Sequence, residues 1–478
     1  MNRDPSSERD NPAQALGALL QRQREAFAAD PAPGPEVRRG RLERLRRAVL
    51  DRHTALTAAL DQDFGGRSAQ ESTTVDLLPT LTGIRHAHRH LRRWMRPRRR
   101  WPHPLMQPAA ARVHYQPLGV VGIIVPWNYP VYLALSPLTG ALAAGNRALL
   151  KLPELTPATN AVLRQVVADA FTAEEVTVVE GGEAVSREFA ALPFDHLLFT
   201  GSPAVGRKVM AAAAGHLTPV TLELGGKSPA IVDGDADIEA AAGRIAYGKL
   251  LNAGQTCIAP DYVLCPADRR DALVAAIRRA AARFYPDPVC NPDYAAVITH
   301  RHRERLHALL ADARDRGAEV VPMGEAVEDA PETGKMAPWL VLSAPSSARV
   351  LEEEIFGPIL PIVAVADLWE ALRYVRAGPR PLALYYFGQD RRRQEQVLVR
   401  SHSGGVCIND TVLHVAQDNL PFGGVGASGM GRYHGFEGFR TFSNEKAVLR
   451  KGDWNSARLI EPPYGGLVHR LVQRLMVR

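Results

Sequence analysis

The stretch RALLKLPELTPATNAVLRQVVADAF, residues 147 to 171, predicts a buried strand that leads directly into a helix. Its first part is a short apolar run, which is typical of a strand buried on both faces. Its second part predicts a helix, with Thr156 as the N-cap and Pro157 at the first helical position. A strand followed so closely by a helix is the repeating unit of a parallel sheet that is covered by helices.

The same alternation continues on both sides of this stretch. Residues 12 to about 100 carry apolar positions at helical spacing, and PAVGRKVMAAAAG (203–215) predicts another helix. Strands are predicted in ARVHYQPLGVVGIIVP (111–126), VTVVEG (176–181), HLLFTGS (196–202), PVTLELGG (219–226), PDYVLC (260–265), KMAPWLVL (335–342) and GGVCIND (404–410). We therefore expect an α/β protein. Without internal repeats or low-complexity linkers, its domains should be built into one another.

Composition limits the class of protein. A chain of 478 residues exceeds what one hydrophobic core usually supports, so two or three domains are expected. Its four cysteines contain no CxxC pair, which argues against a disulfide framework and against a metal site, and favours reduced thiols in a cytoplasm. Residues 1–16 are polar and do not resemble a signal peptide. The uncharged segment 118–146 contains three prolines that would break a membrane-spanning helix, so we expect a strand, a turn and a buried helix there.

Two basic segments leave alternatives open. The net charge is +7, and residues 85–101, RHAHRHLRRWMRPRRRW, supply much of the excess. They could form a patch for nucleic acid or a membrane surface, but a solvated helix face followed by a basic loop is the preferred interpretation. The C-terminal YGGLVHRLVQRLMVR is amphipathic. Weak contact with a membrane surface or with another subunit is the alternative to a plain surface helix.

Cys257 is the strongest candidate for chemistry. It lies in LLNAGQTCIAPDY, residues 250 to 262. A lone cysteine is either a small apolar core residue or a nucleophile, and this sequence pattern alone does not decide between them.

Other candidate residues lie where predicted strands end. Glu223 follows an apolar strand, where a raised pKa would suit a general base, although a structural carboxylate is the alternative. Asn128 stands between prolines in PWNYP, where its amide could hold an oxyanion or simply satisfy a turn. The turn FTGSPAVG (199–206) could accept a phosphate at its helix start, and Lys151 with Glu154 could meet a ribose.

Taken together and in order, these motifs resemble those of the NAD(P)-dependent aldehyde dehydrogenase superfamily. Glu223 and Cys257 also stand 34 positions apart, as is usual in that family. The resemblance covers roughly residues 110 to 445, and GQTCIAPDYVLC with HVAQDNLPFGGVGASGMGRYHG is similar to the class 3 branch, closest to the bacterial coniferyl aldehyde dehydrogenases. The motifs that carry it are PWNYP, Lys151 with Glu154, FTGSPAVG, ELGGKSP, GQTC, EEIFGP (353–358) and PFGGVGASGMGRYHG (421–435).

The resemblance implies a reaction. Cys257 would attack an aldehyde to give a thiohemiacetal, with the oxyanion held by the Asn128 side chain and the backbone N–H of Cys257. Hydride loss to the cofactor would leave a thioester, which water activated by Glu223 would hydrolyse to the carboxylic acid. The residues implied in binding NAD, with NADP as the alternative, are Trp127, Lys151, Glu154, Gly201, Ser202, Gly206, Leu224, Gly225, Glu354 and Phe356. Trp127 and Tyr129 would also shape the wall of the active site.

One motif departs from the family pattern. The family usually has Lys-Pro-Ser-Glu or Lys-Pro-Ala-Glu where this chain has Lys151-Leu152-Pro153-Glu154. Moving the proline changes which residue is conformationally restricted, and this bears on the ribose contacts and on the preference for NAD.

By the same resemblance, the fold would be a Rossmann-type doubly wound cofactor domain, a second α/β catalytic domain and a small oligomerisation element. We expect the cofactor domain at 12–224, with 105–120 contributing to oligomerisation, the catalytic domain at 225–434, and a C-terminal arm and tail at 435–478. A cytoplasmic homodimer is implied.

Two other functions are alternatives to aldehyde oxidation by hydrolysis of the thioester. A CoA-acylating relative would resolve the thioester with a thiol, but Glu223 is the kind of base that hydrolysis requires. A non-catalytic basic binding protein on the same fold would act through residues 85–101, but the set of Cys257, Glu223 and Asn128 argues against it. We therefore expect oxidation of a hydrophobic or aromatic aldehyde such as coniferyl aldehyde, and no nucleic-acid partner.

Overall fold

A six-stranded sheet built from the first half of the chain organises the molecule. The computed structural model describes residues 12–324, 328–330, 332–456 and 461–476, so the expectation that the chain begins without a signal peptide falls mainly outside it. The strands, in spatial order, are β15 (Gly429–Met430), β7 (Val220–Leu224), β6 (His196–Gly201), β3 (Val120–Ile124), β4 (Arg147–Lys151) and β5 (Val176–Val179). All neighbours are parallel except β15 and β7. The order β7-β6-β3-β4-β5 is that of a doubly wound sheet, which confirms the expected fold.

Helices cover both faces of this sheet because its strands are apolar on both sides. Leu149 on β4 packs into one apolar cluster and Leu150 beside it packs into the other. On one face lie α2 (Pro35–Asp51), α3 (His53–Asp63), α5 (Leu78–Trp94), α6 (Pro130–Ala144) and α7 (Pro157–Ala170). On the other face lie α1 (Pro12–Ala29), α8 (Glu183–Ala190) and α9 (Pro203–Ala214). A short helix, α4 (Ala69–Ser72), and a π-helical turn, η2 (Thr73–Leu77), join α3 to α5.

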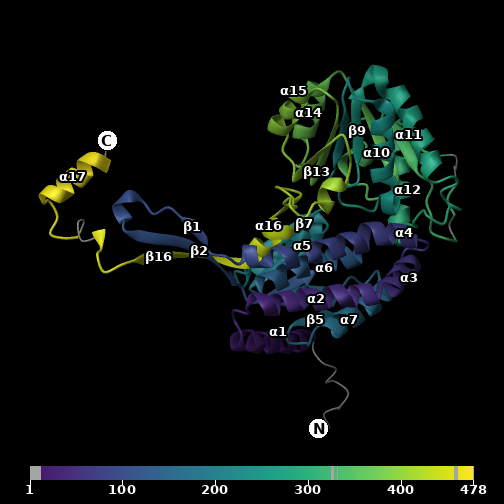
Figure 1. Ribbon diagram of the computed structural model, residues 1–478. Helices are drawn as coiled ribbons and strands as arrows, with labels where there is room; N and C mark the ends of the chain where they lie inside the picture. The colour runs from purple at the N-terminus through teal and green to yellow at the C-terminus, as the bar shows by residue number, and fades with distance from the viewer. Residues whose placement is uncertain (1–11, 325–327, 331, 457–460, 477–478) are drawn as a thin grey trace, which may run out of the picture.

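A seven-stranded sheet forms the second half. Its strands, in spatial order, are β10 (Glu319–Pro322), β11 (Trp339–Leu342), β12 (Ile359–Val365), β9 (Tyr262–Pro266), β8 (Pro229–Val232), β13 (Ala383–Phe387) and β14 (Gly405–Ile408), with only β10 antiparallel to its neighbour. The helices around it are α10 (Ile238–Leu250), α11 (Arg270–Phe284), α12 (His300–Asp315), α13 (Arg349–Glu352), α14 (Leu368–Ala377) and α15 (Arg391–Arg400). In Figure 1 this part lies above the helices α2, α5 and α6.

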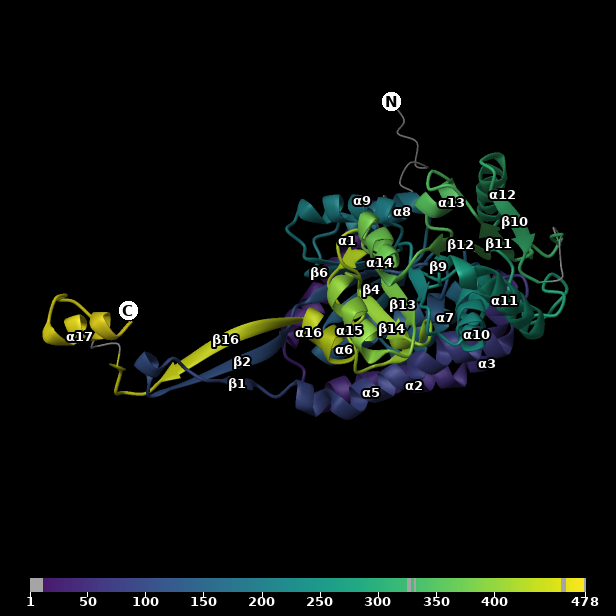
Figure 2. The same ribbon diagram turned by 90° about the horizontal axis from the view of Figure 1, so that it is seen from above.

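An arm extends away from both sheets. It is a three-stranded antiparallel sheet of β1 (Arg98–Arg100), β2 (Ala109–Pro117) and β16 (Ser443–Lys451). α16 (Gly435–Thr441) leads into it, and α17 (Leu467–Met476) lies at its far end (Figures 1 and 2). The pairing of β2 with β16 joins the two parts of the chain that the sequence assigned to the oligomerisation element.

The basic segment 85–101 is partly as expected. Its first part is helical, with His86 and His90 one turn apart on α5 and their rings 4.2 Å apart. The expected basic loop is wrong, because Arg98–Arg100 form β1 and pair with β2. Although its side chains are exposed, β1 pairs through its backbone with β2. Local sequence does not reveal this pairing between separate segments.

The boundary predicted between residues 224 and 225 stays a prediction. β7 ends at Leu224 in the first sheet and β8 begins at Pro229 in the second. The short strand β15, from the segment assigned to the catalytic domain, returns to the first sheet and pairs Gly429 with Glu223. The two units are thus interleaved rather than consecutive.

Candidate active site

The carboxyl ends of the first sheet gather most of the predicted residues. β3 leads into Trp127 and Asn128, β6 ends at Gly201 next to Ser202, and Glu223 lies at the end of β7. β3 and β6 are neighbours whose connections run to opposite faces, so a crevice opens between them at this edge. Ligands of doubly wound folds bind in this position.

Cys257 comes to the same place from the second sheet. It follows the tight turn η4 (Leu251–Gly254) and precedes β9. Gly254 has φ of +76°, and a Cβ there would lie 2.3 Å from the carbonyl oxygen of Gly357, so only glycine fits. Asn252 also adopts a left-handed conformation, with φ of 51°, which is uncommon outside glycine. The backbone before the thiol is therefore tightly constrained.

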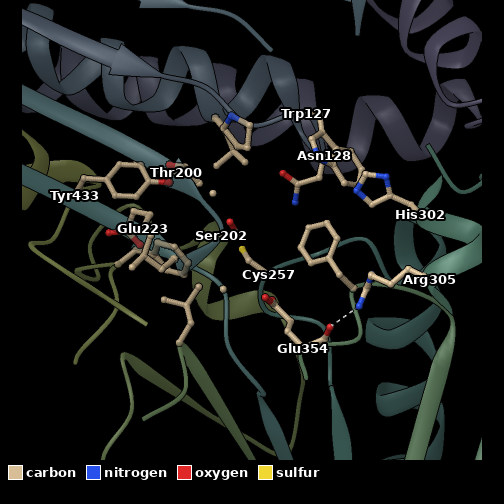
Figure 3. Close-up of a pocket in the computed structure, with 18 residues that line it drawn as sticks. Trp127, Asn128, Thr200, Ser202, Glu223, Cys257, His302, Arg305, Glu354 and Tyr433 are labelled. Carbon is tan, nitrogen blue, oxygen red and sulfur yellow. Dashed lines mark hydrogen bonds between the residues drawn. The ribbon is translucent and has the colours of Figure 1, made fainter. Parts of the chain in front are cut away.

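A cavity of about 290 Å³ surrounds the thiol (Figure 3). Asn128 and Glu354 lie on either side of Cys257, and Glu223 lies across the cavity from Arg305. The structure thus brings the predicted catalytic residues to one cavity. Its walls are formed by Pro126, Trp127, Asn128, Leu133, Thr200, Gly201, Ser202, Glu223, Leu224, Gly225, Cys257, His302, Arg305, Glu354, Phe356, Leu382, Phe422 and Tyr433.

The thiol of Cys257 is held in its protonated form in the free protein. Burial raises its pKa to about 12, and the carboxyl groups of Glu354 and Glu223 act in the same direction when they are ionised. The backbone N–H groups of Cys257 and Ile258 oppose this shift, because they stabilise negative charge on the sulfur. The same N–H groups could stabilise an oxyanion that forms beside the sulfur.

The amide of Asn128 lies in the cavity wall and is held in place. Its Nδ2 donates to the carbonyl oxygen of Gln255 at 3.1 Å, and an amide nitrogen has a second N–H. The backbone carbonyl oxygen of Asn128 accepts from Asn252 Nδ2 at 3.1 Å. Asn128 is therefore bonded on both sides to the turn that carries the thiol.

Glu223 is a buried carboxyl that makes no hydrogen bond to any residue the structure describes. Burial raises its pKa well above the usual value, and the positive charge of Arg432 opposes this only partly. Burial therefore disfavours the ionised form of this carboxyl. A buried carboxyl of this kind is able to exchange a proton with water near it.

Glu354 and Phe356 form part of the wall of the first cavity, with Glu354 on the other side of Cys257 from Asn128. Burial raises the pKa of Glu354 to about 8, with Asp261 adding to the shift and the backbone N–H of Gly226 opposing it. Arg305 donates to the carbonyl oxygen of Glu354 at 3.1 Å, as Figure 3 marks. The ring of Phe356 stands edge-on to that of Trp127, with centroids 5.4 Å apart.

A second cavity of about 490 Å³ continues from this one toward the edge of the first sheet. Trp127, Gly201 and Ser202 line both cavities, while Lys151 and Glu154 line only the second of these two. Ser202 caps α9, and its hydroxyl accepts from Val205 N at 3.4 Å.

The walls of the second cavity fit a dinucleotide. The positive end of the α9 dipole and the cations Lys208 and Arg187 suit a pyrophosphate. The exposed carboxylate of Glu154 is the group that can accept from a ribose diol. Lys151 is held by its bond to the carbonyl oxygen of Leu152 at 2.6 Å, and burial lowers its pKa.

A third cavity, of about 310 Å³, also has Cys257 in its wall. It is mainly apolar. Its walls come from the π-helical turn, α5, α6, α10 and the chain after β14, and are formed by Thr74, Val75, Leu78, Pro79, Thr82, Tyr129, Tyr132, Leu133, Tyr247, Leu251, Thr256, Cys257, Ile258, Val412, Leu413, Val415, Ala416, Phe422 and Tyr433.

One predicted binding residue lies away from the cavities. A Cβ at Gly206 would lie 2.6 Å from Leu224 Cδ2, so this glycine brings α9 close to β7. In contrast, Gly225 is in the wall, and a Cβ there would lie 2.0 Å from the carboxyl of Glu354. Sequence reasoning missed His302 and Arg305, because a helix as charged as α12 is typical of a solvated surface.

Comparisons with known proteins agree with this geometry. The model of the aldehyde dehydrogenase family matches residues 10–448. The chain belongs to the aldehyde dehydrogenase family. It is accordingly an oxidoreductase that acts on aldehydes and uses a nicotinamide dinucleotide.

Three proteins illustrate the similarity within the family. A "Probable coniferyl aldehyde dehydrogenase" of Pseudomonas aeruginosa is 51% identical over 463 residues, which are 97% of this chain and 96% of the relative. "Aldehyde dehydrogenase family 3 member B1" of Rattus norvegicus is 42% identical over 93% of this chain and 94% of its own. The structure of the substrate-bound state of Staphylococcus aureus AldH has a TM-score of 0.91 at 36% identity, covering 96% of this chain and 99% of that one.

Metal sites and membrane-spanning helices are absent from the described part of the chain. No group of three His, Cys, Asp or Glu side chains there is arranged to hold a metal ion. None of the helices in residues 12–324, 328–330, 332–456 and 461–476 is long and apolar enough to cross a membrane.

Proposed function

We propose that this family member oxidises hydrophobic, aromatic aldehydes of the coniferyl type to their carboxylic acids, with Cys257 as the nucleophile. The observation that carries the proposal is the position of Cys257. Cys257 lines both the first cavity, which continues into the one whose groups suit a dinucleotide, and the third cavity, whose walls are mainly apolar. A reacting carbonyl at this point meets the sulfur, the Asn128 amide and the cofactor cavity together.

The roles of the protein groups follow from their positions. The sulfur of Cys257 adds to the carbonyl carbon, and the thiol proton passes to water as the negatively charged adduct forms. The Asn128 amide and the backbone N–H of Cys257 hold the negative oxygen. The bound nicotinamide supplies the acceptor for the hydride. Glu223, in its ionised form, then takes a proton from the water that attacks the thioester and passes it to the departing sulfur, which releases the acid and restores the thiol.

The substrate class rests on the third cavity. Val75, Leu133 and Phe422 are among its walls, and an aromatic side chain or a conjugated ring would bury its apolar surface there. The relatives named for coniferyl aldehyde, at 45% and 51% identity, support this class.

For the cofactor, we propose NAD with NADP as the second choice. The carboxylate of Glu154 in the second cavity would repel a 2′-phosphate. Lys208 in the same cavity works in the other direction, because its charge would attract that phosphate. Turnover measured with NAD and NADP in parallel decides between them.

A homodimer in the cytoplasm is proposed for the assembly and location. The arm of β1, β2 and β16 extends from the body, and Leu449 on it is half exposed. At its end, Leu467, Leu471 and Leu475 are exposed on one face of α17, and contact of this face with a membrane surface is the alternative to contact with a second chain. Light scattering coupled to gel filtration measures the assembly, and Leu449→Lys should weaken it.

The direct test follows the acyl group. Wild-type enzyme quenched during turnover of cinnamaldehyde and NAD should carry the acyl mass on the peptide with Cys257. Cys257→Ser should lose turnover but retain NAD binding, whereas the matched Cys290→Ser, at an exposed thiol, should retain both. An adduct on another residue, or undiminished oxidation by Cys257→Ser, would contradict the proposal. Acceleration by CoA instead of hydrolysis would indicate a CoA-acylating enzyme.

A further inference from the structure

Arg67 is a fully buried arginine directly behind the active-site wall. It lies between α3 and α4, and its side chain has no exposed surface. The guanidinium stands 5.1 Å from the ring centre of Phe64 and 4.8 Å from that of Tyr129. Without any exposed surface, Arg67 is shielded from substrate, so any effect on the reaction has to pass through its neighbours.

Two carboxylates accompany this arginine. Glu71 lies 3.4 Å from Arg67 Nε, and Asp76 lies 3.5 Å from Nη1. The geometry is poor for stability, because Nε and Nη2 of Arg67 and Oδ2 of Asp76 make no hydrogen bond within the described residues. A buried ion pair with unfilled donors usually stabilises a fold no better than apolar side chains of the same size. Fold stability therefore does not account for the cluster.

The contacts of the cluster converge on the catalytic groups. Arg67 Nη1 donates to the carbonyl oxygen of Asn128 at 3.3 Å, and Asn252 Nδ2 shares that acceptor at 3.1 Å. Glu71 accepts from the backbone N–H of Asn252 at 3.1 Å. Tyr129, stacked on the guanidinium, bonds through its hydroxyl to that of Thr256 at 2.5 Å.

The cluster contacts a segment whose backbone conformation is unfavourable for its residues. Asn252 and Ala253 both have left-handed backbones, with φ of 51° and 50°. Such non-glycine residues keep this conformation only where their surroundings impose it. At the other end, Asp76 accepts from Tyr132 N at 2.5 Å in the first turn of α6, which begins directly after Asn128 and Tyr129.

We propose that Arg67, oriented by Glu71 and Asp76, is a positioning residue that fixes the Asn128 amide against the turn of Cys257. This inference rests on the proposed function, since it assigns Arg67 a task only if Asn128 holds the oxyanion. Arg67 fixes the carbonyl of Asn128, and Asn128 Nδ2 in turn bonds to Gln255 O at 3.1 Å. A displacement of about 1 Å at such a group can cost about 100-fold in rate.

A double-mutant cycle tests the route of the effect. Arg67→Met replaces the charged side chain with an unbranched apolar one that can fill much of the same space. We expect its kcat to fall about 10- to 100-fold, with the KM for aldehyde and the Kd for NAD changed less than about threefold. Combined with Asn128→Ala, the same substitution should cost threefold or less, because the amide that it positions is gone. Arg67→Lys should retain more of the kcat than Arg67→Met, since lysine keeps the positive charge but lacks the planar guanidinium and its several donors.

A matched control separates this effect from the loss of a buried arginine. Arg38 is also buried and donates to the carbonyl oxygen of Ala144 at 2.6 Å, at the opposite end of α6. Arg38→Met should lower the melting temperature and leave kcat within about twofold of wild type.

Several outcomes would overturn the inference. An unchanged kcat in Arg67→Met, or an equal loss with and without Asn128, would show that Arg67 does not act through this amide. Failure of both Arg67→Met and Arg67→Lys to fold would show that the cluster serves stability. If Asn128→Ala alone left kcat unchanged, the proposed oxyanion site would fail first and this inference with it.

Discussion

Replacing Glu223 by glutamine should change how stability depends on pH. In the unfolded chain this carboxyl ionises near its ordinary pKa of 4.5, whereas burial in the folded protein raises its pKa well above that value. Between the two pKa values the folded protein binds more protons than the unfolded chain. Rising pH therefore favours unfolding, and the group costs about 1.4 kcal/mol of stability for each pH unit in that window.

The magnitude follows from this slope. While the pH lies between the two pKa values, wild type should lose about 1.4 kcal/mol more of its free energy of unfolding per pH unit than Glu223→Gln, which has no proton to release. We compare the two proteins at pH 5.5 and pH 7.5. Urea titrations of both proteins at the two pH values, at one protein concentration, give the difference. Glu188 is exposed on α8, and Glu188→Gln is the control that should show no such divergence.

A functional measurement accompanies the stability measurement. Thioester hydrolysis in single-turnover experiments should speed up with pH in wild type, as Glu223 gains the charge that accepts a proton. In Glu223→Gln it should be slow and insensitive to pH. If wild type and Glu223→Gln lost equal stability between pH 5.5 and 7.5, the argument that burial disfavours the ionised form of this carboxyl would be refuted.

Two further predictions concern the cavities. Gly225→Ala places a methyl group 2.0 Å from a Glu354 oxygen and should weaken NAD binding about 10-fold by calorimetry, while Gly234→Ala, where a Cβ would meet no atom within 4 Å, should bind normally. Val75→Glu puts a charge in the apolar cavity and should raise the KM for cinnamaldehyde about 10-fold by loss of roughly 1.4 kcal/mol of apolar contact, but that for acetaldehyde much less. Val75→Leu is the apolar control, and equal effects on both aldehydes would contradict the assignment of this cavity.

Local sequence predicted strands such as β3, β4 and β7 because each is a short, buried, largely apolar run. The stretch 147–171 forms β4 and α7, with Thr156 as N-cap and Pro157 as the first helical residue. The capping partner was not predictable. The side chain of Thr156 makes no capping hydrogen bond. Instead, the carboxylate of Asp63 on another helix accepts from Thr159 N at 2.8 Å.

The candidate site shows the same division. Cys257, Glu223 and Asn128 stood out because motifs place them at strand ends and in tight turns. Arg67 and Arg305 did not, because their sequence neighbours are polar and charged like those of surface residues. Only the packing of α4 and α12 against the site buries these side chains, and such contacts between distant segments leave no local pattern.

Cys257 lines two cavities, and this has a consequence for the order of events. Under the proposed function, an aldehyde in the apolar cavity and a dinucleotide in the cavity along the first sheet are bordered by different residues, so they approach the sulfur without crossing each other's path. Neither has to arrive before the other for steric reasons. By the same reasoning, the acid can leave through the apolar cavity while the reduced dinucleotide is still bound. Neither product then blocks the dissociation of the other.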